Sequence, residues 1–142
     1  MNNTNYKHAT ILLVEDDDID AKIVERAFSK LRIANPIIRA KNGIAALELL
    51  RDGTVSRPYI ILLDLNMPRM GGLEMLEELR ADNDLKDSLV FVLTTSKDDE
   101  DKIAAYNKNI AGYILKEKLQ HNFEDLIQLL DYYWRIVELP GN

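Results

Sequence analysis

A single aspartate, Asp64, stands at the end of a short apolar run and directly before a turn. The preceding residues, Tyr59 to Leu63, are mostly isoleucine and leucine, and a run this short and apolar predicts a strand buried on both faces. In open parallel α/β sheets, ligands bind beyond the carboxyl ends of the strands. The sequence therefore makes Asp64 a candidate nucleophile, with the turn at 65–68 beside it.

Further reactive side chains follow other predicted strands in the same way. They are Glu15 and Asp16 after the apolar residues 11–14, Thr94 after residues 89–93, and Lys116 after residues 112–115. A parallel sheet ordered 2-1-3-4-5 places the first, third, fourth and fifth strands side by side. In that order all these side chains open onto one crevice. We therefore expect three carboxylates, one hydroxyl and one ammonium group at a single site.

Such a set of side chains favours phosphoryl transfer to the protein itself. Carboxylates within a few ångströms of one another stay ionised together only beside a cation. An all-oxygen set without His or Cys predicts Mg²⁺, or Mn²⁺ in its place, and the backbone carbonyl of Asn66 is a further candidate ligand. A lysine and a hydroxyl suit the oxygens of a phosphoryl group. The expected chemistry is in-line attack by Asp64, with Lys116 and Thr94 holding the product.

The spacing of apolar residues predicts the elements that position this site. Helical stripes occupy segments 19–31, 44–50, 73–79, 103–110 and 119–134, and they alternate with strands at 11–14, 36–40, 59–63, 89–93 and 112–115. Five β-α units in succession predict a doubly wound, five-stranded parallel α/β sheet with helices on both faces. The acidic run Asp98–Asp101 is assigned to helix capping, because carboxylates are favourable at a helix N-terminus.

Composition limits the classes of function. The 142 residues suit one domain, 1–142, with a polar tail over 1–9, an aromatic C-terminal helix and tail over 119–142, and no output domain. A net charge of −6 disfavours nucleic acid and anionic membranes. The chain has no cysteine, no apolar run near the roughly 20 residues of a membrane span, and no signal-peptide pattern. We therefore expect a cytoplasmic protein that binds neither membrane nor nucleic acid.

Each feature has a plainer interpretation when taken alone. Asp17 or Asp18 before a helix is most often an N-cap, and Thr94 suits the end of a strand. His8 and His121 lack the partners that a metal or phosphohistidine site needs. The argument for chemistry rests on the concurrence of suitable residue types at four separate strand ends.

Other functional templates match less well. A calcium loop starting at Asp16 would need Gly where Ala21 stands and a bidentate Glu where Ala27 stands. No glycine-rich nucleotide motif occurs. A phosphatase or mutase with an aspartyl-phosphate needs an acid–base aspartate two residues after the nucleophile, where this chain has Asn66. A phosphorylation-independent binding module predicts a gap in the acidic set, and the sequence shows none.

Together these residues resemble the receiver domain of two-component response regulators, over about the whole chain from Ile11 onward. The resemblance implies a flavodoxin-like fold. It also implies a domain that takes a phosphoryl group from a sensor histidine kinase, or from small donors, and slowly hydrolyses it without being a conventional enzyme. The roles that it implies are Asp64 as phosphoacceptor, Asp16 as direct Mg²⁺ ligand, Glu15 as ligand through water, the Asn66 carbonyl as ligand, Thr94 and Lys116 as phosphate-sensing pair, and Tyr113 as switch aromatic.

Two positions depart from the receiver pattern. Glu117 replaces the proline that usually follows the lysine in a cis peptide, which leaves the conformation of the Lys116–Glu117 peptide open. Thr95 replaces a residue that is often small.

The segment 94–96, the missing proline and the C-terminal tail are similar to stand-alone regulators paired with bacterial phytochrome kinases, which often dimerise. The alternatives are a stand-alone receiver for another kinase and an intermediate relay protein. Exposed aromatic residues favour interfaces. We therefore expect a homodimer or partner interface at Tyr132, Tyr133, Trp134, Ile136, Val137 and Leu139.

Overall fold

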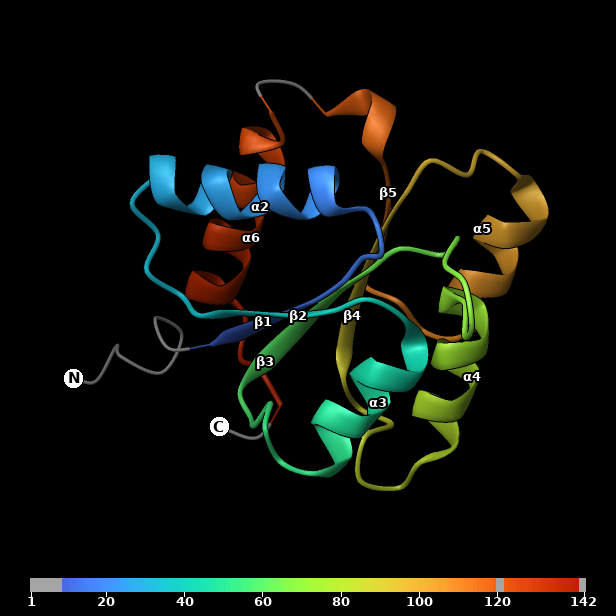
Figure 1. Cartoon of the computed structure of the whole chain (residues 1–142). Helices are drawn as coiled ribbons and strands as arrows, with labels where there is room; N and C mark the ends of the chain where they lie inside the picture. The colour runs from blue at the N-terminus through green and yellow to red at the C-terminus, as the bar shows by residue number, and fades with distance from the viewer. Residues whose placement is uncertain (1–8, 120–121, 141–142) are drawn as a thin grey trace.

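The computed structural model describes residues 9–119 and 122–140. Its centre is a five-stranded parallel sheet in the order β2-β1-β3-β4-β5, as predicted. The strands are β1 (Thr10–Val14), β2 (Ile37–Ala40), β3 (Tyr59–Leu63), β4 (Leu89–Thr94) and β5 (Gly112–Leu115). Helices α2 and α6 cover one face of the sheet, and α3, α4 and α5 cover the other (Figure 1).

Polar side chains cap the N-termini of three of the described helices, α2, α3 and α5. The bounds of the helices are α2 (Asp18–Lys30), α3 (Gly43–Arg51), α4 (Gly72–Ala81), α5 (Asp99–Tyr106), the 3₁₀ helix η1 (Lys116–Lys118) and α6 (Glu124–Ile136). Asp17 caps α2 by accepting from the amides of Ile19 and Asp20, and Asp98 caps α5 by accepting from the amide of Glu100. Each such cap stabilises the fold by about 1 kcal/mol. Capping is therefore the role of Asp17 and of the acidic run that starts at Asp98.

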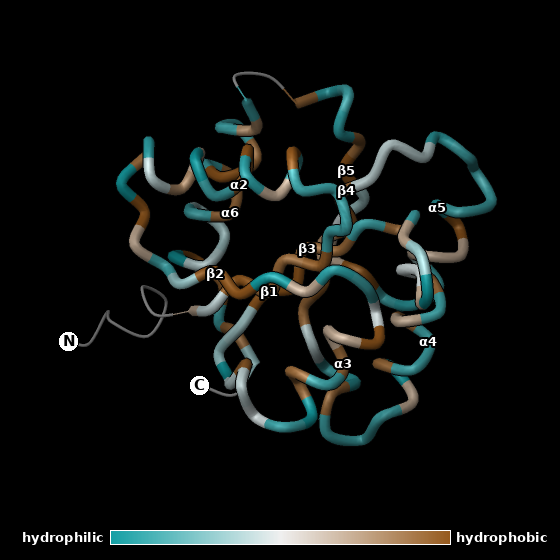
Figure 2. Tube along the Cα trace, in the orientation of Figure 1, coloured by the Kyte–Doolittle hydropathy of each residue, from teal (hydrophilic) through white to brown (hydrophobic). Residues whose placement is uncertain are grey.

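The central strand β3 is buried on both faces, as its composition predicts. Ile60 and Leu62 pack with α2 and α6, while Ile61 and Leu63 pack with α3 and α4. Figure 2 shows the hydrophobic strands in the middle of the molecule, between helices with hydrophilic outer faces. Burying each such side chain contributes about 1.5–3 kcal/mol before entropy costs. The end of β3, and with it Asp64, is consequently held on a rigid element.

The C-terminal aromatic residues are divided between core and surface, which corrects the expected interface. Trp134 is 1% exposed and stacks on Phe28 with ring centroids 6.3 Å apart, because the stripe at 126, 127, 130 and 134 of α6 faces the sheet. Leu139 is also buried, and the half-buried Tyr133 packs its ring edge to face with Phe91. The interface prediction was wrong for Trp134 and Leu139, which belong to the core. The exposed members are Tyr132, Ile136 and Val137.

Other local expectations also differ from the structure. The last helix starts at Glu124 and not at Leu119, because Phe123 has a left-handed backbone (φ 68°) that interrupts the helix. Ile19, expected on the core stripe of α2, is exposed. Ala9, expected in the polar tail, is buried and its carbonyl accepts a hydrogen bond from Asn35 at 2.9 Å.

Two further expectations concern the histidines and membrane-spanning segments. His8 and His121 lie outside the described residues. In residues 9–119 and 122–140, none of the helices has both the length and the apolar character of a transmembrane span.

Candidate functional site

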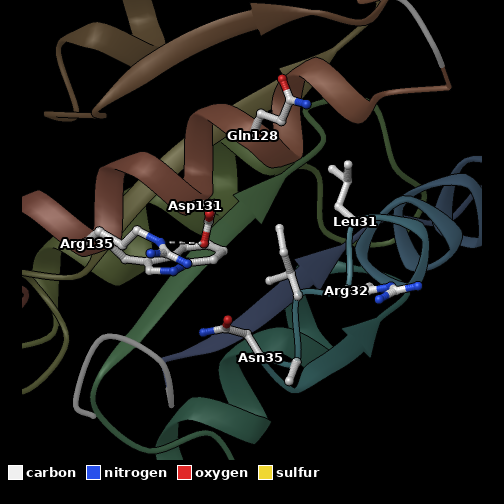
Figure 3. Close-up of a pocket in the computed structure, with 9 residues that line it drawn as sticks. Leu31, Arg32, Asn35, Gln128, Asp131 and Arg135 are labelled. Carbon is white, nitrogen blue, oxygen red and sulfur yellow. Dashed lines mark hydrogen bonds and ion pairs between the residues drawn. The ribbon is translucent and has the colours of Figure 1, made fainter. Parts of the chain in front are cut away.

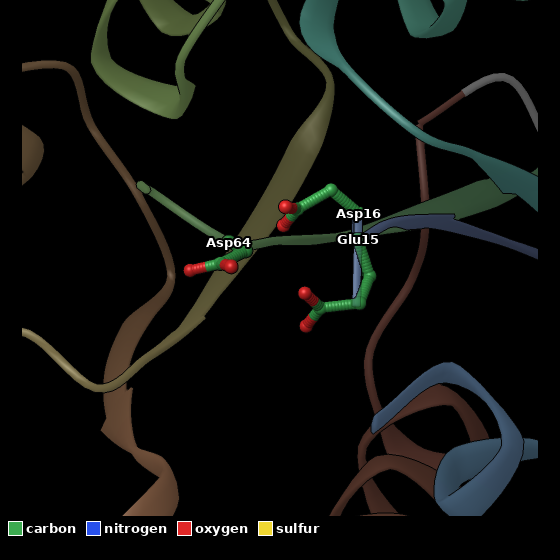
Figure 4. Close-up of side chains that lie close together, drawn as sticks. All are labelled: Glu15, Asp16 and Asp64. Atoms are coloured by element: carbon green, nitrogen blue, oxygen red, sulfur yellow. The ribbon is translucent and has the colours of Figure 1, made fainter. Parts of the chain in front are cut away.

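Three carboxylates meet at the carboxyl end of the sheet. Glu15, Asp16 and Asp64 each offer an oxygen, and these oxygens lie within 4.8 Å of one another. Figure 4 shows the three side chains close together, with Glu15 and Asp16 extending from the end of β1 toward the side of Asp64. The parallel pairing of Val14 with Leu63 ends both strands at the same level, and the Asp64 amide donates to the Val14 carbonyl at 3.0 Å. Residues 49 positions apart are thereby forced together by strand register.

Lys116 joins this cluster from the end of β5. Its Nζ lies 2.8 Å from Glu15 Oε1, 2.7 Å from Asp20 Oδ2 and 3.8 Å from Asp64 Oδ2. The ammonium side chain is 9% exposed. The Lys116–Glu117 peptide is trans and starts the short helix η1, so the open question about this peptide is answered: the chain turns here without the cis bond typical of receivers.

The local field shifts the pKa values of the buried pair. Burial raises the pKa of Glu15 to about 7, against the opposing hydrogen bond from Lys116 and with a further upward contribution from the Asp64 charge. Burial opposes the charge of Lys116, but hydrogen bonds to Asp20 and Glu15 outweigh it and hold the pKa of Lys116 above its ordinary value. The ammonium is therefore charged at neutral pH, while Glu15 is poised to gain or lose a proton.

The remaining predicted residues surround the acidic cluster. Thr94 is buried at the end of β4, and its Oγ1 accepts from the Ser96 amide at 3.2 Å. The Tyr113 hydroxyl donates to the Ser96 carbonyl at 3.0 Å, so one loop residue links both expected switch side chains. The Asn66 amide donates to Asp64 Oδ1 at 3.3 Å, which places the Asn66 backbone beside the acidic side chain. The bulk of Thr95 points to the surface.

Three residues that support the site were not identified from the sequence. Asp20, in the first turn of α2, makes the shortest of the ion pairs with Lys116. Arg39 of β2 donates from Nε to the Glu15 carbonyl at 2.9 Å. Gly72 is the first residue of α4 and packs closely against the Asp64 and Leu65 backbone. The available sequence signals were the closeness of Asp20 to Asp16 in the sequence and the Gly71–Gly72 pair after the β3 turn.

A cavity of about 370 Å³ lies elsewhere, between the α2–β2 connection and α6. Leu31, Arg32, Asn35 and Gln128 line it, and Asp131 pairs with Arg135 on its wall at 3.2 Å (Figure 3). None of the carboxylates at the strand ends lines it. The chemistry therefore belongs to the acidic cluster at the carboxyl end of the sheet and not to this cavity.

Comparison with known proteins identifies the family. The model of the response regulator receiver domain matches residues 11–130. The chain belongs to this receiver family. Response regulator Rcp1 of Synechocystis sp. is 35% identical over 136 residues, which are 92% of each chain.

Solved structures of receivers have the same fold. The Mn²⁺-bound form of Rcp1 superposes with a TM-score of 0.80 at 34% identity, over 94% of this chain and 99% of that one. The phosphorylated cyanobacterial phytochrome response regulator RcpA gives a TM-score of 0.79 at 32% identity, with the same coverage.

Family membership fixes the general role and the cofactor class. A receiver is a regulator in two-component signalling that interacts with a histidine kinase, and it is not a conventional enzyme. The acidic cluster Glu15, Asp16 and Asp64 fits a divalent cation, because three close carboxylates form an all-oxygen donor set that needs a positive charge. The Mn²⁺-bound structure of Rcp1 agrees with this. The predicted Mg²⁺ or Mn²⁺ cofactor is thus confirmed as a class of ion.

Proposed function

We propose that Asp64 is the phosphoacceptor of this receiver. A carboxylate oxygen of Asp64 attacks the phosphorus of a phosphohistidine in line, forming a P–O bond as the P–N bond breaks, and the departing imidazole takes up a proton. Slow attack by water on the same phosphorus later returns inorganic phosphate and the free carboxylate. The observation that carries the proposal is the position of Asp64, 7% exposed, at the mouth of the sheet beside two carboxylates and a lysine.

The neighbouring residues have distinct roles in this proposal. Asp16 and Asp64, the Asn66 carbonyl, and Glu15 through water would hold the cation. A Mg²⁺ ion held there would neutralise negative charge on the oxygens of the transferred phosphoryl group. Lys116 and Thr94 bind the phosphoryl oxygens, since an ammonium and a hydroxyl both donate.

Tyr113 would report the phosphorylated state. Its hydroxyl donates a hydrogen bond to the Ser96 carbonyl, and the amide of the same Ser96 donates one to Thr94 Oγ1. A shift of Thr94 toward a phosphoryl group would therefore disturb both hydrogen bonds. The proposed output surface is the face of α5, β5 and α6, where phosphorylation changes protein contacts. Exposed Tyr132, Ile136 and Val137 on or beside α6 support a homodimer or partner interface on this side.

A phytochrome-type histidine kinase is the proposed phosphodonor. The similarity to Rcp1 and to the phytochrome regulator RcpA supports this assignment over a kinase of another kind or an intermediate relay. We further propose that residues 1–142 act as one cytoplasmic receiver unit without nucleic-acid binding, that small phosphodonors can also phosphorylate it, and that it dephosphorylates itself. The net charge of −6 supports a protein partner over DNA.

The test is phosphorylation followed by intact mass and size-exclusion chromatography. With Mg²⁺ and acetyl phosphate, the protein should gain the mass of one phosphoryl group, and Asp64→Asn should gain none. The matched control is Asp52→Asn, which neutralises an exposed carboxylate at the C-terminal end of α3 that accepts a hydrogen bond from the Thr54 amide. Phosphate uptake that survives Asp64→Asn would refute the assignment of Asp64. A protein that elutes as a monomer with and without phosphorylation would refute the proposed homodimer. Phosphoryl transfer from an autophosphorylated phytochrome kinase tests the proposed donor.

A further inference from the structure

The ammonium group of Lys116 donates two short hydrogen bonds and has a third N–H donor that neither of them uses. A lysine ammonium carries three N–H donors. Two are used by Glu15 and Asp20, at 2.8 and 2.7 Å, both within charge-assisted hydrogen-bond distance. Asp64 Oδ2 lies 3.8 Å from Nζ, which is too far for a hydrogen bond but places Asp64 as the next carboxylate beside the ammonium group. The space between Nζ and Asp64 is where an oxygen of an aspartyl-phosphate would be received.

Asp20 differs from Glu15 in being outside the acidic cluster that fits the cation. The cluster consists of Glu15, Asp16 and Asp64, so a cation competes with Lys116 for two of its three carboxylate neighbours. Asp20 is the partner of Lys116 for which the cation does not compete. Its position is rigid, because it lies in the first turn of α2 directly after the Asp17 cap.

The backbone directly after Lys116 is not fixed by a proline. Glu117 stands where receivers have proline, the peptide is trans, and β5 is only half-buried at the edge of the sheet. A lysine side chain loses about 2 kcal/mol of rotamer entropy when it is fixed, so a partner must hold it in place.

We propose that Asp20 is a positioning residue for phosphoryl transfer: its carboxylate holds the Lys116 ammonium so that the remaining N–H faces Asp64. This inference rests on the proposed function of Asp64. It makes α2 part of the phosphorylation site, through a contact between residues 96 positions apart.

Positioning and simple charge predict opposite results when Asp20 is neutralised. Asp20→Asn removes a negative charge near an anionic phosphodonor, and by charge alone phosphorylation would become faster. If Asp20 positions Lys116, phosphorylation by acetyl phosphate at saturating Mg²⁺ becomes slower, by about tenfold or more, the usual effect of losing such a supporting partner. The matched control is Asp18→Asn. Asp18 lies in the same first turn of α2, but its carboxylate pairs with Arg39 and not with Lys116.

Two further measurements separate positioning from a general structural effect. In the Lys116→Gln background, Asp20→Asn should not slow the reaction further, because residues that act through one another are not additive. In metal-free protein, the ¹⁵Nζ signal of Lys116, visible when hydrogen bonds protect its protons from exchange, should disappear in Asp20→Asn and persist in Asp18→Asn.

The outcomes are distinct. A wild-type protein that takes up no phosphate refutes the proposed function. A wild-type protein that is phosphorylated normally, with Asp20→Asn equally fast or faster, overturns the role of Asp20 alone. An additive effect in the Lys116→Gln background, or a Lys116 signal unchanged in Asp20→Asn, overturns it as well.

Discussion

Gly72 controls the position of the nucleophile through its lack of a side chain. It is the first residue of α4, and a Cβ added there would lie 2.5 Å from the Asp64 carbonyl oxygen and 2.7 Å from Leu65 Cα. Both are backbone atoms, which cannot rotate away as the end of a flexible side chain can. Gly72→Ala must therefore push α4 and the β3–α4 loop apart, although the backbone angles of this position suit any residue.

The size of the effect follows from these distances. Ordinary contacts begin near 3.4 Å, so the loop has to move by about 1 Å. Overpacking of this kind costs about 1–3 kcal/mol of folding free energy. A misplacement of about 1 Å at a reacting group can slow a reaction by about 100-fold. Gly72→Ala should thus remain folded and yet take up phosphate far more slowly than wild type.

The assay is the rate of acetyl phosphate labelling by intact mass, together with urea unfolding followed by circular dichroism. Gly112→Ala in β5 is the control, because its Cβ would meet Phe91 at an ordinary distance of 3.4 Å. We expect this control to label at nearly the wild-type rate. Wild-type labelling by Gly72→Ala would refute the argument that the close approach of α4 sets the position of Asp64.

Two other predictions concern the core and pH. Trp134→Ala should lower the free energy of unfolding by about 3–5 kcal/mol, because Trp134 is buried, whereas Tyr132→Ala should change it by less than about 0.5 kcal/mol. Equal losses in urea unfolding would contradict the division of α6 into core and surface. Because burial raises the pKa of Glu15 to about 7, protons compete with the cation below that pH. Mg²⁺ affinity measured by calorimetry should therefore fall by up to about tenfold per unit below pH 7, and an affinity independent of pH would count against Glu15 as part of the site.

Much of the fold could be predicted because its signals are local. Each predicted strand is a short, mostly apolar run, and a residue of the site directly follows four of the five predicted runs, so strand ends and site residues are identified together. Asp64, Asp16, Glu15 and Lys116 meet as expected because parallel strands end at one edge of the sheet. Errors arose where helical periodicity alone was used, as with the exposed Ile19.

Tertiary structure decided which partners these residues have. The contact of Asp20 with Lys116 joins segments 96 residues apart and depends on how α2 packs over the end of β5, which no local pattern encodes. Packing also determined that Trp134 fills the core while Tyr132, two residues earlier on the same helix, is exposed to solvent. The amino-acid sequence by itself therefore determined a phosphoryl-transfer set at the strand ends, because residue type and position at the end of an apolar run are local properties. The orientation of Lys116 and the surface left for a partner were decided only when distant segments packed together.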